Sequence, residues 1–274
     1  YVGNAYGSQF NQQSQLGALI ADYIGLKGVE AYTLEAGGAS GGVALRQGYL
    51  AVASGAVDCA MVMGIEKATD IVGSARTKAS AVSLDADYEA VHGATLTGLA
   101  ALLMRRYMHE YGVELQHFEG FTMNAHTNGK ANPLAMYRNL IKAGSFQNAP
   151  MVAEPVSLFD SAPDGDGAAV VILMPLEKAE DRVAHPIKII GSAVATDTLA
   201  IQDRENLLRL GAVEQSFNKV LAQAGIKRED IHFAELHDAF TILSALSLEA
   251  MGFSDVGKGH EWGANTGESI SLKG

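Results

Sequence analysis

Hydrophobic and polar positions alternate in blocks that predict helices and strands along the first part of the chain. Apolar residues recur at helical spacing over 12–26 and again over 43–53. A short buried strand is predicted at 29–34, and the unbroken apolar run at 59–64 is typical of a strand buried on both faces of a sheet. A strand, a helix and a second strand at this spacing predict a parallel pair joined by a right-handed crossover.

The middle of the chain, 70–155, has a different pattern, in which polar loops separate helices and no strand is evident. One helix is predicted at 96–111 and a second at 134–143. A polar excursion of this length between apolar strands is typical of an insertion. We interpret it as a lid that could close over a site.

Buried strands return after the insertion, beginning with the apolar run at 168–174. The strand–turn–helix unit around His237 repeats the arrangement of the first one around Gly38. The pattern therefore predicts two similarly built α/β halves with a helical excursion between them. The remaining predicted elements are strands at 186–195 and 232–236 and helices at 214–224 and 242–251.

Composition narrows the classes of protein that fit this pattern. The 274 residues are 48% apolar, which is enough to build a large core. The net charge of −11 argues against nucleic acid or an anionic membrane as partner, because both need a clustered basic face. The single cysteine excludes a disulfide framework and a multi-cysteine zinc site, and it fits a reducing, cytoplasmic location. No apolar run reaches the roughly 18 residues that span a bilayer.

Both ends of the chain have the pattern of an interrupted fold. The first residues, 1–4, resemble the end of a strand, and they include no initiator Met or signal sequence. The last residues, 271–274, stop where a new strand or turn is expected to begin. We therefore expect an internal fragment of a longer protein, incomplete at both ends.

A glycine-rich turn at 34–42 is the strongest chemical signal in the sequence. Four glycines within six positions predict a tight connection between a strand and a helix, with few side chains in the way. Such a turn exposes backbone N–H groups at the positive end of a helix dipole, where an oxyanion, a phosphate or a thioester oxygen can bind. The turn contains no obvious nucleophile.

Ser40 allows a second interpretation of this turn. The sequence around it matches the Gly-x-Ser-x-Gly pattern of a hydrolase nucleophile, with Asp230 or Asp238 and His237 or His260 completing a triad. The alternative is that Ser40 caps the following helix through a hydrogen bond from a backbone N–H. Short motifs of this kind arise easily in a glycine-rich run, so we favour the cap.

Two histidines stand out among the eight. His237 follows a predicted strand, and open α/β sheets place ligand sites at the carboxyl ends of their strands. His126 lies in a predicted polar loop that could close over a substrate. The alternatives are a structural histidine at a strand end and an ordinary surface loop, respectively.

Other reactive side chains favour structural interpretations. Cys59 lies at the start of the apolar run and is predicted to be inert core. Asp160, Asp164 and Asp166 could suggest a cation site, but their spacing lacks the final Glu of a calcium loop, and Pro-Asp-Gly is ordinary turn chemistry. We therefore predict no metal site.

Several stretches together resemble the thiolase superfamily: the glycine turn with its helix, 36–55, the loop that carries His126, the segment 237–240 (His-Asp-Ala-Phe), and 165–169. The similarity is to the branch that contains archaeal acetoacetyl-CoA thiolases and sterol-carrier-protein-type thiolases. It implies an α/β fold, a layered αβαβα sandwich of two similar halves. The implied domains are 1–69 with 156–180 as the N-terminal half, 70–155 as the inserted lid, and 181–274 as the start of the C-terminal half.

The resemblance also implies roles for particular residues. His237 takes the position of a histidine that helps to stabilise the thioester oxyanion. Gly38 occupies the position of the family's nucleophilic cysteine, so an acyl group cannot attach there. The family's Gly-His-Pro segment and second cysteine would lie beyond residue 274. The implied substrate-binding residues are His126, Gly37, Ala39, Ser40 and Phe240.

The implied function is that of an enzyme acting on acyl-CoA thioesters, with carbon–carbon bond formation or cleavage and acyl transfer of the acetyl-CoA acyltransferase type. The CoA thioester is the substrate, and no cofactor is implied. One alternative is a thiolase-like aldolase that acts on a β-hydroxyacyl-CoA without a cysteine nucleophile. Another is a non-catalytic acyl-CoA-binding or scaffold subunit. Expected partners are further copies in a homodimer or homotetramer and a zinc-ribbon/OB-fold acyl-CoA-binding protein.

Overall fold

The computed structural model describes residues 1–142, 144–264 and 270. The chain divides into two compact units, each made from two separate stretches of sequence. Unit 1 consists of Tyr1–Ser83 and Asp164–Val194, and unit 2 consists of Leu84–Pro163 and Ala195–Gly274. The domain boundaries implied by the resemblance rest on a different criterion and stay a prediction. The expectation for 271–274 falls outside the described residues.

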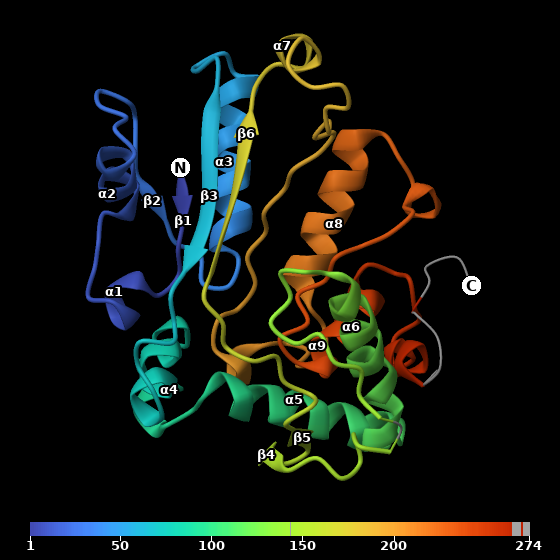
Figure 1. Ribbon diagram of the computed structural model, residues 1–274. Helices are drawn as coiled ribbons and strands as arrows, with labels where there is room; N and C mark the ends of the chain where they lie inside the picture. The colour runs from blue at the N-terminus through green and yellow to red at the C-terminus, as the bar shows by residue number, and fades with distance from the viewer. Residues whose placement is uncertain (143, 265–269, 271–274) are drawn as a thin grey trace. The chain divides into compact units, whose positions relative to one another are not determined.

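Unit 1 is built on a four-stranded sheet with the order β2-β1-β3-β6 (Figure 1). Its strands are β1 (Val2–Gly3), β2 (Thr33–Leu34), β3 (Ala60–Glu66) and β6 (Gly167–Leu173). Because β1 is parallel to both β2 and β3, the predicted parallel relationship of β2 and β3 is confirmed, with β1 between them. β6 pairs antiparallel with β3 along its whole length.

The helices of unit 1 include two that the sequence predicts. α3 (Ser40–Ala53) confirms the helix predicted at 43–53 and begins three residues earlier. α2 (Leu16–Tyr23) is shorter than the predicted 12–26, because Gln12 and Gln15 adopt positive φ angles that a helix does not allow. The remaining helices of this unit are α1 (Gly7–Phe10), α4 (Ser74–Ser80) and α7 (Leu176–Glu180), with a 3₁₀ turn at Ala81–Ser83.

α3 lies unusually close to the sheet because small residues line its inner face. The buried positions of this helix are Ser40, Ala44, Gly48 and Ala51, each about one turn after the one before. A Cβ atom added to Gly48 would lie 2.4 Å from a methyl carbon of Val62 on β3. An added side chain at Gly48 would displace Val62, so glycine at this position lets the middle of α3 pack closely on β3.

Three predictions of burial in unit 1 are wrong. β2 is half-buried rather than buried, and most of β6 is exposed, including Val171. Cys59 is exposed and precedes β3, so it is not the core residue that its apolar neighbours suggest. An apolar run indicates a strand, but which faces are covered depends on packing partners elsewhere in the chain.

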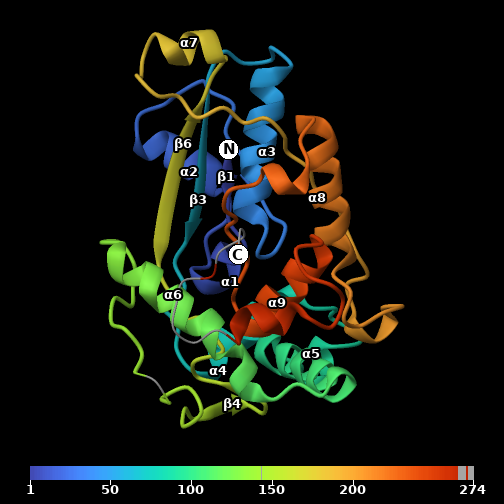
Figure 2. The same cartoon turned by 90° about the vertical axis from the view of Figure 1, so that its right-hand side faces the viewer.

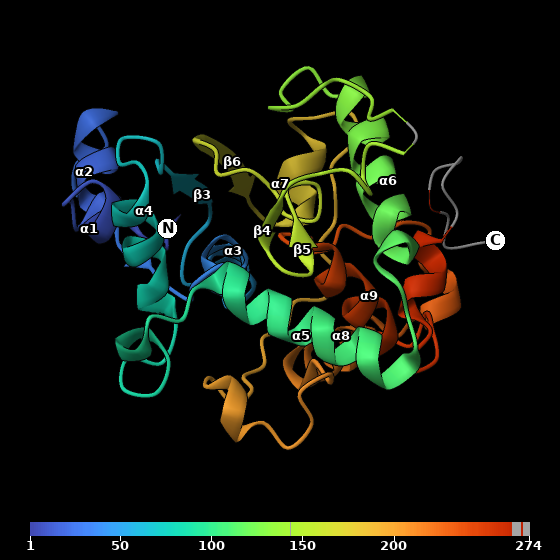
Figure 3. The ribbon, with the colours of Figure 1, turned by 90° about the horizontal axis from the view of Figure 1, so that it is seen from below.

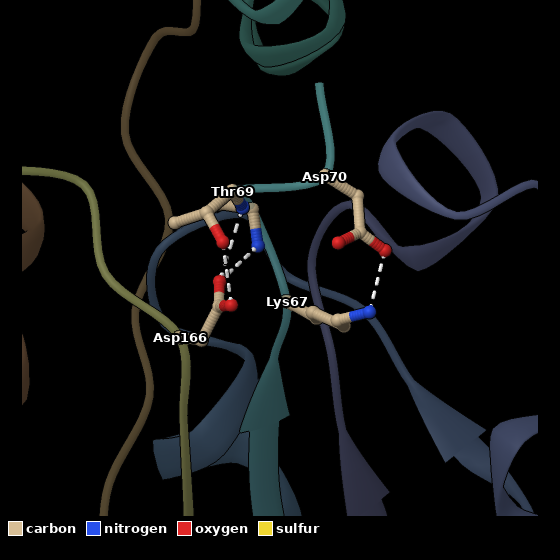
Figure 4. A network of polar contacts seen from close by, with 5 residues as sticks. Lys67, Thr69, Asp70 and Asp166 are labelled. Carbon is tan, nitrogen blue, oxygen red and sulfur yellow. Dashed lines mark hydrogen bonds and ion pairs between the residues drawn. The ribbon is translucent and has the colours of Figure 1, made fainter. Parts of the chain in front are cut away.

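A carboxylate joins the end of β3 to the start of β6 (Figure 4). Asp166 accepts hydrogen bonds from the N–H groups of Ala68 at 2.8 Å and Thr69 at 3.0 Å, and from the Thr69 hydroxyl at 2.7 Å. Lys67 pairs with Asp70 at 2.5 Å beside it. The hydrogen bonds from Thr69 hold the pKa of Asp166 below its ordinary value. Asp166 therefore has a structural role: its carboxylate stabilises the turn that follows β3. Across the described ranges no cluster of three acidic, His or Cys side chains has the geometry of a metal site.

Unit 2 is mainly helical, and α9 contacts α5, α6 and α8 (Figure 2, Figure 3). Its helices are α5 (Leu96–Tyr111), α6 (Glu119–Ala131), α8 (Gly211–Ala224) and α9 (Thr241–Ala250), and a short hairpin joins β4 (Met151–Ala153) to β5 (Val156–Ser157). Short 3₁₀ turns lie at Ala90–His92, Leu115–Phe118, Ile201–Asp203, Arg228–Asp230 and Gly259–Gly263.

Local signals explain why several of these helices match their prediction. α5 has the predicted bounds, because the Thr95 hydroxyl accepts a hydrogen bond from Gly98 N–H at one end and left-handed Gly112 ends the other. α8 ends at Gly225 and α9 is followed by Gly252, both with positive φ, as the sequence predicts. The core of this unit contains fully buried side chains from several of its segments, including Met104, Tyr107, Phe118, Phe146, Ile242 and Leu246.

Other predictions in unit 2 are wrong. α6 forms where a polar loop is predicted, and no helix forms in the described part of 134–143. No strand forms at 232–236 in the described chain, and the same holds for 186–195, nearly all of which belongs to unit 1. A strand needs a neighbour for its ladder, which the apolar pattern of a segment does not reveal. The described helices include none that is both long and apolar enough to cross a membrane.

Candidate functional site

The glycine turn in unit 1 is held together by hydrogen bonds of the Ser40 side chain. The Ser40 hydroxyl accepts a hydrogen bond from Ala36 N–H at 2.9 Å and donates one to the Gly37 carbonyl at 2.7 Å. Gly37 has a φ of +53°, a left-handed conformation that favours glycine. The chain therefore turns sharply between β2 and α3, and Gly38 lies exposed at the bend.

The position of Ser40 argues against the hydrolase interpretation. Ser40 is only 4% exposed, and its hydroxyl is both donor and acceptor within the turn. An attacking hydroxyl has to reach the substrate and pass its proton to a base. Ser40 instead holds the turn together, through bonds to preceding residues rather than through the helix cap that the sequence suggests.

Two N–H groups at the start of α3 are available to a ligand. Gly41 and Gly42 are exposed, and within the described part of the chain neither N–H donates to an acceptor. An added Cβ at either glycine would meet no atom within 4 Å. They lie at the positive end of a helix of 14 residues, which is a favourable place for an anion, and the oxyanion site predicted there from the sequence stays a prediction.

The segment 237–240 in unit 2 leads directly into α9. His237 and Asp238 are exposed, and half-buried Phe240 is the N-cap residue of the helix. An isolated antiparallel bridge pairs Phe240 with Ser161, and Ala162 N–H donates to the Ala239 carbonyl at 2.9 Å. The backbone of this segment is thus held by the loop that follows β5.

A pocket of about 270 Å³ lies beside this segment within unit 2. The N-terminal turn of α9 and Asp238 form one side, and α6 forms another. Its lining combines aromatic and sulfur-containing groups with polar ones, as substrate pockets commonly do. The main contributors are Phe121, Met136, Tyr137, Phe159, Asp238 and Thr241.

His126 belongs to this pocket, but it projects from α6 and not from a loop. Its Nδ1 atom lies 2.9 Å from the Asn139 carbonyl, and its ring is stacked with Tyr137 at 6.4 Å. The predicted pocket-lining position is therefore reached by a different element. Helical spacing of Phe118, Phe121 and Ala125 was the signal that could have identified α6.

The structure places the predicted residues in two separately described sites. Gly37, Gly38, Ala39 and Ser40 form the turn in unit 1, and His126, His237 and Phe240 lie in or beside the pocket region of unit 2. Contacts with substrate at these residues stay predictions.

Comparisons with known proteins show which family this chain resembles. Residues 193–273 match the family model "Thiolase C-terminal domain-like". The chain is 37% identical to an acetyl-CoA acetyltransferase of Methanothermobacter thermautotrophicus over 94% of its length and 67% of the relative's. It is 26% identical to a 17-hydroxy-3-oxo-4-pregnene-20-carboxyl-CoA lyase of Mycobacterium tuberculosis, covering 82% of this chain and 62% of the lyase.

A solved structure confirms the predicted thiolase-like α/β fold. The Ltp2-ChsH2(DUF35) aldolase has a TM-score of 0.79 and 22% identity, covering 96% of this chain and 68% of that one. The chain thus spans about two thirds of the length of these proteins. The identity to the archaeal acetyltransferase, over nearly the whole chain, shows that this chain belongs to the thiolase superfamily.

Proposed function

We propose that the protein acts on acyl-CoA thioesters and forms or cleaves the carbon–carbon bond next to the thioester, in a family whose activity is acyl transfer of the acetyl-CoA acyltransferase type. The observation that carries the proposal is the pair of exposed N–H groups of Gly41 and Gly42 at the start of α3. The similarity to an acetyl-CoA acetyltransferase supports it. Hydrogen bonds at this position stabilise negative charge as it develops on a thioester oxygen.

Three parts of the chain have separate roles in the proposed reaction. The N–H groups of Gly41 and Gly42 bind the thioester oxygen and stabilise the enolate that forms when a general base takes a proton from the neighbouring carbon. His237 supplies a further hydrogen-bond donor for an oxyanion, in the role that its position implies. Within unit 2, the pocket beside Asp238 is a candidate site for an apolar part of a substrate.

An aldolase reaction is the second candidate, and Gly38 is the observation that favours it. A residue without a side chain cannot carry an acyl group, so a reaction through a covalent acyl-enzyme has no attachment point at this position. In cleavage of a β-hydroxyacyl-CoA, a base takes the β-hydroxyl proton, the Cα–Cβ bond breaks, and the resulting enolate takes up a proton. The products are an aldehyde or ketone and a shorter acyl-CoA, and no acyl-enzyme forms. The similarity to a CoA-ester lyase supports this candidate.

Two assays on the full chain separate these reactions. We expect little thiolysis of acetoacetyl-CoA and a gain of thiolysis in Gly38→Cys, since a thiol at a helix N-terminus has a lowered pKa. The backbone permits this change, because Gly38 is not among the glycines with positive φ. Ser54→Cys is the matched control: it places an exposed thiol at the other end of α3 and should not restore thiolysis. Strong thiolysis by the unchanged chain would contradict our interpretation of Gly38.

The aldolase reaction is tested with 3-hydroxybutyryl-CoA, from which cleavage releases acetaldehyde and acetyl-CoA. We expect His237→Ala to lower the rate by roughly 10²-fold, as removal of one oxyanion donor does in other enzymes. His232→Ala is the control, since this exposed histidine lies in the same extended segment. An unaffected His237→Ala variant would remove His237 from the mechanism. Binding of CoA esters with no turnover of either substrate would favour the scaffold alternative.

The proposal extends to assembly and location. A homodimer or homotetramer is expected from the family, together with an acyl-CoA-binding partner of the zinc-ribbon/OB-fold kind in the cytoplasm, serving lipid metabolism. The aldolase with a DUF35 component supports the existence of such a partner. Co-purification of a tagged chain from its own cytoplasm, followed by measurement of the complex mass, tests all three expectations.

A further inference from the structure

Asp160 is a buried acid that the proposed function does not use. It is 2% exposed and lies in the floor of the unit 2 pocket, on the loop after β5. One carboxyl oxygen accepts a hydrogen bond from Ser157 N–H at 2.9 Å, and the other accepts one from the Thr241 hydroxyl at 2.6 Å. The carboxyl group therefore links its own loop to the first residue of α9 across 81 positions of sequence.

Backbone contacts continue this link toward His237. Thr241 N–H donates to the Asp160 carbonyl at 3.0 Å, so the two residues are joined by both backbone and side chain. The next contacts along the pair are the bridge between Ser161 and Phe240 and the hydrogen bond from Ala162 N–H to the carbonyl of Ala239. Residues 160–162 of the loop and residues 239–241 thus form one short antiparallel pair, which begins two residues after His237.

The loop is itself anchored on its other side. The Thr122 hydroxyl of α6 donates to the Phe159 carbonyl at 2.7 Å, and Asp160 N–H donates to the carbonyl of Ser157 at 3.1 Å. Ser157 is completely buried. Asp160 therefore connects α9 to a loop that is itself anchored by hydrogen bonds.

His237 depends on this pairing for its position. It is exposed, and among the described residues its side chain makes no hydrogen bond of its own. Its place is therefore set by the backbone that follows it, which the loop holds through Asp160.

Burial raises the pKa of Asp160, and the hydrogen bonds from Thr241 and Ser157 oppose that rise.

We propose that Asp160 is a positioning residue, which fixes the backbone of 237–241 and thereby the place of His237 in the reaction. The proposal rests on the role of His237 under the proposed function. Small displacements of a reacting group are costly, since a shift of about 1 Å can lower a rate about 10²-fold. We therefore expect Asp160→Ala to lower kcat for 3-hydroxybutyryl-CoA cleavage by between about 10-fold and 100-fold, with KM changed by less than about 3-fold.

The first test is a double-mutant cycle with His237→Ala on the full chain. If Asp160 acts through His237, Asp160→Ala will lower kcat in the wild-type background and cause no further loss in the His237→Ala background. Equal losses in both backgrounds would overturn the proposal. Asp160→Asn should recover much of the rate, because its amide can still accept from Ser157 N–H and donate to the Thr241 oxygen. Asp255→Ala, which removes an exposed acid of the same unit, is the control.

The second test needs no turnover. Hydrogen–deuterium exchange at the backbone amides of Ala162 and Thr241 should rise by at least about 10-fold in Asp160→Ala, while exchange in α5 stays unchanged. Unchanged exchange at both amides would overturn the proposal. Thr241→Val, which removes the hydroxyl and keeps the shape, should give the same local rise if Asp160→Ala does not fold. Normal activity of His237→Ala together with faster exchange in Asp160→Ala would show that the proposed role of His237 fails while the positioning by Asp160 holds.

Discussion

Gly3→Ala tests whether the start of α3 is fixed by its contact with the sheet. Gly3 on β1 lies under the first turn of the helix, and an added Cβ would lie 2.4 Å from the Ser40 carbonyl oxygen and 2.7 Å from Gly41 Cα. Ordinary contact begins at 3.4 Å, so 3.4 Å minus 2.4 Å leaves the helix start about 1 Å too close. Both neighbours are backbone atoms that cannot rotate away. The first turn of α3 must therefore move.

The expected loss combines two opposing effects. Overpacking of a well-fitted site costs about 1–3 kcal/mol, while replacing a glycine reduces the entropy of the unfolded chain and returns about 0.4–1 kcal/mol. We expect a net destabilisation of about 1–2 kcal/mol. The same shift of about 1 Å displaces the N–H groups of Gly41 and Gly42, so turnover should fall by up to about 10²-fold.

Urea denaturation measures the free energy of unfolding, and the 3-hydroxybutyryl-CoA assay measures turnover. Gly64→Ala is the matched control on the neighbouring strand β3, because its added Cβ would lie 3.8 Å from Gly41 Cα, in ordinary contact. It should behave like the unchanged chain in both measurements. Gly3→Ala with unaltered stability and turnover, or an equal loss in Gly64→Ala, would refute this account of α3.

Three further predictions concern stability. Tyr107→Phe should lower the free energy of unfolding by about 1–3 kcal/mol in urea titrations, because the hydroxyl that donates to Glu249 at 2.6 Å is lost and the carboxylate keeps fewer partners. Met104→Ala, at a fully buried position, should cost about 2–5 kcal/mol through the cavity it leaves, and a loss below about 1 kcal/mol would contradict the assignment of this core. The folded-state pKa of Asp166 lies below its ordinary value of 3.8, so its contribution is present above that pH and is lost as the pH falls through the folded-state pKa. Asp166→Asn should therefore be less stable than the unchanged chain near neutral pH, and the difference should shrink in strong acid.

Local chemistry explains which elements the sequence predicts well. α5 has an apolar face, a threonine N-cap just before it and a left-handed glycine just after it. Its bounds can therefore be predicted from the local sequence alone. α6 was missed because its polar residues, including Asn124 and Asn128, hide the spacing of its apolar face. The exposed strand β6 shows the same limit, since burial depends on segments far away in sequence.

The candidate site was only partly predictable for the same reason. The glycine turn could be located because its residues are contiguous, and its Gly-rich composition dictates the shape. The residues around Asp160 predict only a turn, because its hydrogen-bond partner Thr241 is 81 positions away in the sequence. Pairing of that kind is a property of the folded chain. No local pattern distinguishes this acid from its exposed neighbour Asp164.

The close approach of α3 to the sheet has a consequence for how the turn would respond during a reaction. Where Gly3 meets the first turn of α3, its nearest neighbours are backbone atoms of Ser40 and Gly41, so no rotamer at this contact has to change when charge appears at the helix start. Dipoles that are already oriented stabilise that charge without reorganisation. The free-energy cost of aligning these dipoles arises once, when the protein folds, and does not recur in every catalytic cycle.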